Sequence, residues 1–154
     1  MTTMSRRLPL IALATLALGC SATLSPDEAL TAKRNAGATV GPAVLSFFGD
    51  VTTVTLPESA RVGEPVRVTA TAFGGGCVSE GGTETSVSAR VAEVRPLRVE
   101  VSDPDTFCTM EVRIFEHAAV LRFAEPGAAL VRVIGIARPG DTPFVVERRL
   151  TVLP

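Results

Sequence analysis

Alternation of apolar and polar residues is the feature that most constrains the fold of this chain. Val66, Val68 and Ala70 are separated by the polar residues Arg67 and Thr69. Successive side chains of an extended chain point to opposite faces, so a period of two gives one buried face and one solvated face. The same period recurs in three later stretches, which are residues 86–91, 98–101 and 144–153. The chain is therefore predicted to consist mainly of β-strands.

Further strands are predicted from composition and length, at residues 43–48, 51–56, 111–115, 119–123 and 129–137. Residues 131–136 are almost continuously apolar, which predicts a central and heavily buried strand. In the last strand, Arg148 falls on the same face as the apolar residues Val146 and Leu150. A charged residue on that face predicts either a β-bulge or an edge position.

Glycine and proline residues separate the predicted strands. Pro126-Gly127 suits a type II turn, because proline fixes φ at the first central position and glycine takes the positive φ at the second. Other turn sequences are Gly63-Glu64-Pro65, Gly74-Gly75-Gly76, Gly81-Gly82 and Pro139-Gly140-Asp141. Many short strands joined by such turns predict a single antiparallel β-sandwich of about seven to nine strands over residues 41–154. A small β-barrel is the alternative fold.

This strand pattern resembles the immunoglobulin-like and fibronectin-like sandwiches. The resemblance rests on the number of strands, since the chain has no Trp and no Tyr. It therefore lacks the core tryptophan and the tyrosine corner of antibody-type domains. Leu, Val, Ile and the seven Phe residues are expected to fill the core instead.

The N-terminal segment has the three parts of an export signal. Arg6 and Arg7 precede an apolar run over residues 8–18, which ends in Gly19-Cys20. A helix over residues 8–19 spans only about 18 Å, whereas the hydrocarbon core of a bilayer is about 30 Å thick. The segment is therefore expected to act as a transient signal and not as a transmembrane anchor.

The ending Ala17-Leu18-Gly19-Cys20 resembles the lipobox of bacterial lipoproteins, with Ala17 where the usual box has leucine. The resemblance implies removal of residues 1–19 and lipidation of Cys20, whose acyl chains would hold the protein at a membrane. Ser21 follows the cysteine, which by the same resemblance indicates the outer membrane, facing the periplasm or the cell surface. The alternatives are an ordinary signal with an incidental cysteine, or a buried N-terminal helix.

Residues 20–40 are expected to form a tether between the lipid and the β domain. Ser25 can cap a helix that starts at Pro26, with Glu28 completing a capping box, and Gly37 can end it. So short a helix is marginal without packing. A spacer that lifts the domain off the bilayer is preferred here to a partner-binding helix.

Cys77 and Cys108 remain once Cys20 is assigned to lipid. An even pair of cysteines in an exported domain predicts a disulfide. Two buried thiols or a metal site are the alternatives. A metal site is disfavoured because these cysteines and the single histidine, His117, supply too few ligands for a tetrahedral cage.

Composition argues against several kinds of binding. Removal of Arg6 and Arg7 leaves 13 basic and 16 acidic residues, a net charge of −3. This balance and the scattered cationic residues give no electrostatic footprint for nucleic acid. Carbohydrate-binding modules rely on exposed Trp or Tyr platforms, which the chain lacks.

No residues are assigned to catalysis, to a cofactor or to a metal. His117 is expected to be a surface or hydrogen-bonded structural residue at a strand boundary, and no Gly-x-Ser-x-Gly sequence accompanies it. Asp103 and Asp105 are expected to form a turn, although calcium could use such carboxylates. Glu80 and Glu84 are placed in a solvated loop, and the three glycines at 74–76 lack the Lys-Ser/Thr ending of a phosphate-binding loop.

These observations predict a lipid-anchored cell-envelope protein that is not an enzyme. Its β-sandwich is expected to be a protein-interaction or structural module with an unknown envelope partner. The alternative is a periplasmic inhibitor or a ligand-binding lipoprotein. The glycine-rich segment 73–85 is the candidate binding loop, and a flexible connection is its other interpretation.

Overall fold

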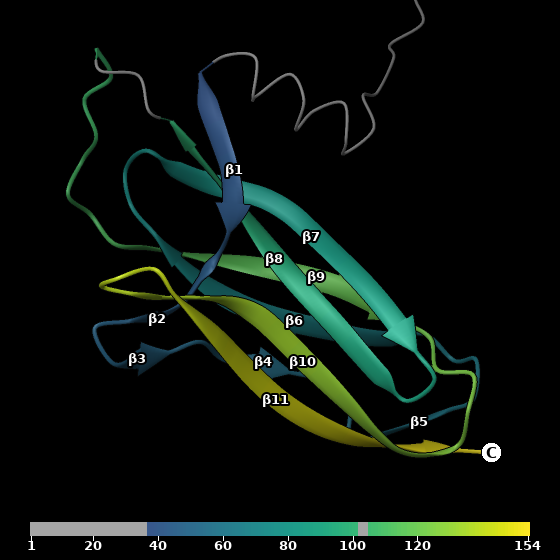
Figure 1. Cartoon of the computed structure of the whole chain (residues 1–154). Helices are drawn as coiled ribbons and strands as arrows, with labels where there is room; N and C mark the ends of the chain where they lie inside the picture. Colours follow the sequence, from purple (N-terminus) through teal and green to yellow (C-terminus); the bar gives the residue numbers. More distant parts are fainter. Residues whose placement is uncertain (1–36, 102–104) are drawn as a thin grey trace, which may run out of the picture.

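The structure is a computed structural model that describes residues 37–101 and 105–154. Within these residues all regular structure is β, and eleven strands form one sheet (Figure 1). The strands are β1 (Ala38–Pro42), β2 (Val44–Phe47), β3 (Asp50–Val51), β4 (Val54–Thr55), β5 (Ser59–Arg61), β6 (Val66–Gly74), β7 (Val78–Ser88), β8 (Val91–Val101), β9 (Arg113–Leu121), β10 (Gly127–Arg138) and β11 (Thr142–Leu153). The all-β prediction is confirmed. The signal segment, Cys20 and the helix predicted after Ser25 lie outside the described residues.

The sheet has more strands than the seven to nine predicted, because some strands are too short to show alternation. β3 and β4 have 2 residues each and β5 has 3. The predicted strand 51–56 is divided between β3, which pairs with β2, and β4, which pairs with β6. β1 begins at Ala38, ahead of the residue 41 at which the β domain was expected to start.

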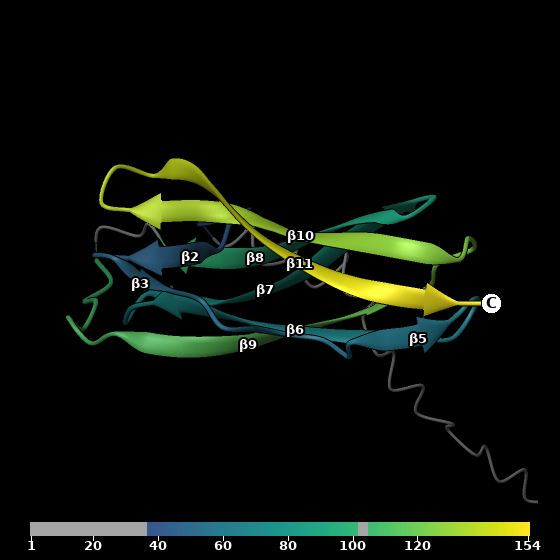
Figure 2. The same cartoon turned by 90° about the horizontal axis from the view of Figure 1, so that it is seen from below.

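The sheet is curled so that its two halves face each other. Figure 2 shows β8 and β10 in one layer and β6 and β9 in the other. β2 joins the layers, because it pairs with β10 and, through Val44, with Phe73 of β6. None of the strand pairs within the described residues joins β7 to β9, so the curled sheet is open along this side.

The prediction of a purely antiparallel sheet was wrong. β10 runs parallel to both β8 and β2, and β11 runs parallel to β5. The cause is that the chain leaves β8, forms β9 in the opposite layer, and then returns as β10 beside β8 in the same direction. A connection that crosses to the other layer and back makes neighbouring strands parallel.

Two of the predicted strand boundaries are also corrected. The expected strands 111–115 and 119–123 are one continuous strand, β9, and His117 lies in its middle, opposite Ala70. Conversely, the stretch 86–91 is not one strand, because the chain turns at Ala89 and Arg90 between β7 and β8. Ala89 takes a positive φ of 53° there, without any glycine or proline to mark the turn.

The segment 73–85 is not a long loop. β6 extends to Gly74 and β7 begins at Val78, so only residues 75–77 connect them. Glu80 and Glu84 therefore lie on a strand and not in a solvated loop. Pairing along the whole of β8 outweighs the weak strand propensity of glycine and glutamate.

The core lies between the two layers and consists mainly of small aliphatic residues. Its fully buried members include Leu45, Val68, Val94, Leu121 and Val133. Of the seven phenylalanines expected there, only Phe123 is fully buried, at 1% exposure, whereas Phe107 is 91% exposed. Alanine and valine at most inward positions bring the layers close together and leave little room for aromatic rings.

Two expectations for β10 and β11 are confirmed. β10 is central, with β11 along one edge and β8 and β2 along the other, and Val131 and Val133 are completely buried. Arg148 pairs in unbroken register with Val131 and is exposed, and β11 pairs with β5 only from Thr151 onward. Arg148 therefore occupies an edge position, and no bulge is needed.

Candidate functional site

A cavity of about 250 Å³ opens at the end of the sheet where β2, β6, β7, β8 and β10 meet the segment before β9. Its walls are mainly apolar, and three charged side chains also reach it. The lining residues are Val44, Phe47, Phe73, Gly74, Gly75, Val78, Arg98, Thr109, Met110, Glu111, Val112 and Arg138. The cavity therefore draws together residues that lie far apart in the chain.

Two phenylalanines form one wall of this cavity. The rings of Phe47 and Phe73 are stacked, with centroids 6.0 Å apart and planes inclined by 26°. Pairing of Val44 with Phe73 holds β2 against β6 and so fixes both rings. Stacked rings of this kind offer a flat apolar surface to a bound group.

Arg98 of β8 supplies the cavity's most unusual polar group. Its side chain is 13% exposed, and its Nη2 atom lies 3.2 Å from Oε2 of Glu100 and 3.8 Å from Oδ2 of Asp141. Its Nη1 atom is buried and has no hydrogen-bond acceptor within the described part of the chain. A buried donor without a partner costs roughly 1–3 kcal/mol, and more when it is charged. Such a group is a candidate for contact with a ligand.

Arg138 of β10 belongs to the same ionic network. Its Nε atom donates to Oδ1 of Asp141 at 3.0 Å, and its Nη2 atom lies 3.5 Å from Oε2 of Glu100. Glu100 and Asp141 thus each contact both arginines, and neither carboxylate lines the cavity. The network holds the two guanidinium groups in place.

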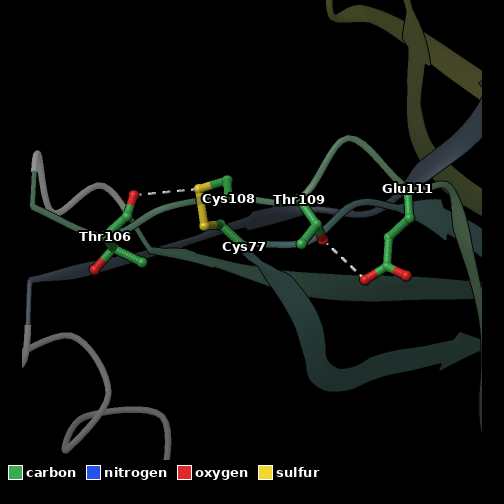
Figure 3. The surroundings of a disulfide bond; sticks show 5 residues. All are labelled: Cys77, Thr106, Cys108, Thr109 and Glu111. Atoms are coloured by element: carbon green, nitrogen blue, oxygen red, sulfur yellow. Dashed lines mark hydrogen bonds between the residues drawn. A yellow bond between two sulfur atoms is a disulfide. The ribbon is translucent and has the colours of Figure 1, made fainter.

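The remaining wall comes from residues 109–112, which the disulfide restrains. Cys77 and Cys108 are bonded, with Cα atoms 5.1 Å apart, as Figure 3 shows. This agrees with the disulfide predicted for an oxidising compartment. The amide of Gly76 also donates to the carbonyl of Thr109 at 3.3 Å. The short β6–β7 connection therefore anchors the segment that closes the cavity.

Among the residues that the structure describes, Glu111 is the one carboxylate that lines the cavity. The Thr109 hydroxyl donates to its Oε1 atom at 2.9 Å, and Arg113 forms an ion pair with the same oxygen (Figure 3 shows the threonine contact). These hydrogen bonds, from Thr109 first and then Arg113, lower the pKa of Glu111 below its ordinary value. The carboxylate is therefore ionised, and its Oε1 atom is held by Thr109, which also lines the cavity, and by Arg113, which does not.

His117 does not line the cavity. It points inward from the middle of β9 and is 2% exposed. Its Nδ1 atom lies 3.2 Å from the Gly82 carbonyl and 3.4 Å from the Thr83 hydroxyl. Of the two arrangements expected for His117, a surface residue or a hydrogen-bonded one, the ring has the second, and its predicted place at a strand boundary was wrong.

Other residues considered from the sequence do not join this site. Asp103 lies outside the described residues. Among residues 37–101 and 105–154, no group of three or more His, Cys, Asp or Glu side chains could hold a metal ion. No helix in this part of the chain is long and apolar enough to cross a membrane.

Sequence reasoning missed Arg98, Arg138 and the phenylalanine wall. Arg98 belongs to an alternating stretch and was placed on a solvated face. The one signal in the sequence was that Arg98 lies between Cys77 and Cys108 and follows Phe73. These residues come together in space only because the chain crosses from β6 to β7. Comparison with protein-family models, with curated proteins and with solved structures found no match to the chain.

Proposed function

We propose that this chain is a lipid-anchored cell-envelope protein whose β domain is a non-enzymatic binding module. The cavity beside Arg98 is its binding site. One observation carries the proposal: a mainly apolar cavity is lined by Arg98, whose buried Nη1 atom has no acceptor among the described residues. Binding pockets typically combine apolar walls with a few fixed polar groups of this kind.

The anchoring part of the proposal rests on the sequence Arg6-Arg7, the apolar run and Cys20. Two or three acyl chains on Cys20 would give stable membrane attachment, since each buried methylene contributes about 0.8 kcal/mol. Ser21 favours the outer membrane. Mass spectrometry of the mature protein should find an acylated N-terminal Cys20, and the Cys20→Ser chain should lack the acyl mass. An unmodified Cys20 or a different N-terminus would overturn this part.

The binding role is favoured over catalysis by the way the polar groups are arranged. The charged side chains at the cavity are held by ion pairs, and the ring of His117 is buried away from the cavity. A general base has to reach its substrate within hydrogen-bonding distance.

We also propose that the two layers form an immunoglobulin-like sandwich, supported by the crossing of β9 between the parallel strands β8 and β10.

Site-specific crosslinking tests the binding role. A photo-crosslinking amino acid would replace Met110, which lines the cavity and is fully exposed. The matched control position is Val120, an exposed apolar residue of β9 away from the cavity. In whole cells we expect a discrete adduct from position 110 and none from position 120.

The dependence of that adduct on Arg98 makes the test specific. Arg98→Gln should abolish the adduct, whereas Arg132→Gln, which changes an exposed arginine paired with Glu147, should leave it unchanged. Absence of any adduct from position 110, or an adduct that is indifferent to Arg98→Gln, would overturn the proposed site.

A further inference from the structure

We propose that the cavity binds the C-terminal residue of a partner polypeptide, with its free carboxylate on Arg98 and its apolar side chain between the cavity walls. This inference rests on the proposed function and specifies what the site recognises. It follows from the unpaired donor, the charges at the cavity and the size of the space.

The polar end of the ligand follows from Arg98. Arg98 lines the cavity, and its Nη2 atom is occupied by Glu100 and Asp141, whereas its Nη1 atom is buried and has no acceptor among the described residues. A guanidinium group only donates hydrogen bonds, so the ligand must present an acceptor oxygen. A carboxylate forms a hydrogen bond about twice as strong as a neutral carbonyl does. The missing partner is therefore best supplied by a carboxylate.

The charges at the cavity favour the same choice. Among the described residues, Arg98 and Arg138 line it, and Glu111 is the one carboxylate that does. Glu100 and Asp141 pair with both arginines, so these four charges balance, but neither of the two carboxylates lines the cavity. The guanidinium groups are therefore the members of this network that reach the ligand space. An amine or another cation would meet two arginines there. An anionic oxygen is complementary to both.

The apolar end of the ligand follows from the walls and the volume. The stacked rings of Phe47 and Phe73, together with Val44 and Val78, suit an aliphatic or aromatic group. One water occupies about 30 Å³ in the liquid, so a cavity of about 250 Å³ holds about eight groups of that size. A terminal leucine has about nine non-hydrogen atoms, whereas a long acyl chain exceeds the space.

The position of Val112 explains how the rest of a bound polypeptide could extend from the cavity into solvent. Val112 lines the cavity and is 57% exposed, and Met110 beside it is fully exposed. This side of the cavity is therefore open to solvent. A polypeptide could place its last residue inside and continue outward across Val112. The opening also offers a place to change charge without disturbing the core.

Fluorescence anisotropy with short peptides tests the proposal. The probe is a dye-labelled peptide of four glycines followed by leucine, added to the full-length chain in detergent. The free-acid peptide should bind at least ten times more tightly than the same peptide with a C-terminal amide. Octanoate is the small-molecule carboxylate for comparison, and it should compete only weakly. Tighter binding of octanoate than of the peptide would overturn the polypeptide as the ligand.

Four variants separate the site from general effects on folding. Arg98→Gln should weaken binding of the free acid at least tenfold, and Arg132→Gln should leave it unchanged. At the exposed opening, Val112→Asp should weaken binding severalfold, whereas Val112→Lys should preserve or strengthen it. The Val112 pair keeps the test informative even if Arg98→Gln destabilises the fold.

Two results would overturn this inference about the ligand and would still be compatible with the proposed function. One is equal affinity for acid and amide, and the other is no binding of any peptide. In either case an adduct from position 110 that depends on Arg98 would still support a binding module with a different ligand. Conversely, peptide binding that is indifferent to both Arg98→Gln and Val112→Asp would place the peptide elsewhere and overturn this inference.

Discussion

The Nδ1 atom of His117 lies 3.2 Å from the carbonyl oxygen of Gly82, across the open side of the curled sheet. β7 and β9 share no backbone ladder, so this side-chain contact links the two layers there. The Gly82 carbonyl can accept only from a protonated Nδ1, which assigns that hydrogen to Nδ1 in the neutral ring. Glu80 is the nearest charged group, with its Oε1 atom 3.8 Å from Nδ1.

The first prediction concerns the dependence of stability on pH. Burial lowers the pKa of His117 below its ordinary value of 6.5, and the Glu80 charge and the Gly82 hydrogen bond offset part of this effect. In the unfolded chain the ring takes up a proton as the pH falls through about 6.5, while the folded ring stays neutral. The stability contribution is therefore fully present above pH 6.5. It is lost as the pH falls from there towards the lower pKa of the folded state.

Urea unfolding at pH 7.5 and pH 5.5 measures this effect. One proton can change the free energy of unfolding by no more than about 1.4 kcal/mol per pH unit. His117→Gln keeps a hydrogen-bond donor but does not titrate, so it should lose less stability between these two pH values than the natural chain does. Equal losses in the two chains would contradict the assignment, because every titratable group other than His117 is present in both.

The second prediction concerns the bulge that receives His117. The pairing of β7 with β8 shifts register between Glu80 and Gly82, and Gly82 has a φ of +95°. A Cβ atom at Gly82 would have open space around it, so Gly82→Ala tests backbone strain alone. We expect a cost of about 1–2 kcal/mol in the free energy of unfolding.

Gly41→Ala is the matched control, because Gly41 also has open space and no positive φ. Its effect should stay within about 0.5 kcal/mol. If the two alanine variants prove equally stable, the left-handed conformation at Gly82 does not constrain the bulge.

The strands that the sequence predicted well are those whose alternation is backed by long pairing. β6 and β10 were both found within a few residues of their ends, because each has one continuous inward face. β11 was found equally well, although the exposed Arg148 interrupts its apolar face. β9 was divided in the prediction because Glu116 and His117 interrupt its apolar pattern. The Gly82 carbonyl satisfies the polar ring from the opposite layer, and this is a contact that local sequence does not reveal.

The candidate site was harder to predict for a related reason. Arg98 and Glu100 alternate with Val99 and Val101, which is the ordinary pattern of a solvated face. Arg98 is nevertheless largely covered, and it lies between β7 and β1, where it is paired with Glu80 and Gly41. Burial of a long side chain at the end of a sheet depends on where other segments cross. By contrast, the cysteine pair was predictable, because that prediction needed only the number of cysteines and the compartment expected from the N-terminal segment.

The third prediction compares two phenylalanines with opposite environments. Phe123 is buried in the core, and Phe123→Ala should lower the free energy of unfolding by about 3–5 kcal/mol. Phe107 is 91% exposed, and Phe107→Ala should change it by no more than about 0.5 kcal/mol. Chemical denaturation of both variants checks the assignment. A large loss at Phe107 would mean that this ring packs against another part of the protein.

The fourth prediction links the disulfide to both stability and binding. The bond joins residues 31 apart. Closing a loop of this size restricts the unfolded chain and so raises the free energy of unfolding by about 3–4 kcal/mol. The double variant Cys77→Ser and Cys108→Ser should therefore unfold at a clearly lower urea concentration than the oxidised chain. Adding reductant to the natural chain should move it towards the variant, and reductant should leave the variant itself unchanged.

The same double variant should also bind the leucine-ended peptide more weakly, because Thr109, Met110 and Val112 line the cavity directly after Cys108. Without the bond, the Gly76–Thr109 hydrogen bond remains to tie this segment to the β6–β7 connection. Measuring affinity well below the unfolding midpoint separates the local effect from global unfolding. Unchanged affinity together with reduced stability would show that the disulfide stabilises the fold without shaping the site.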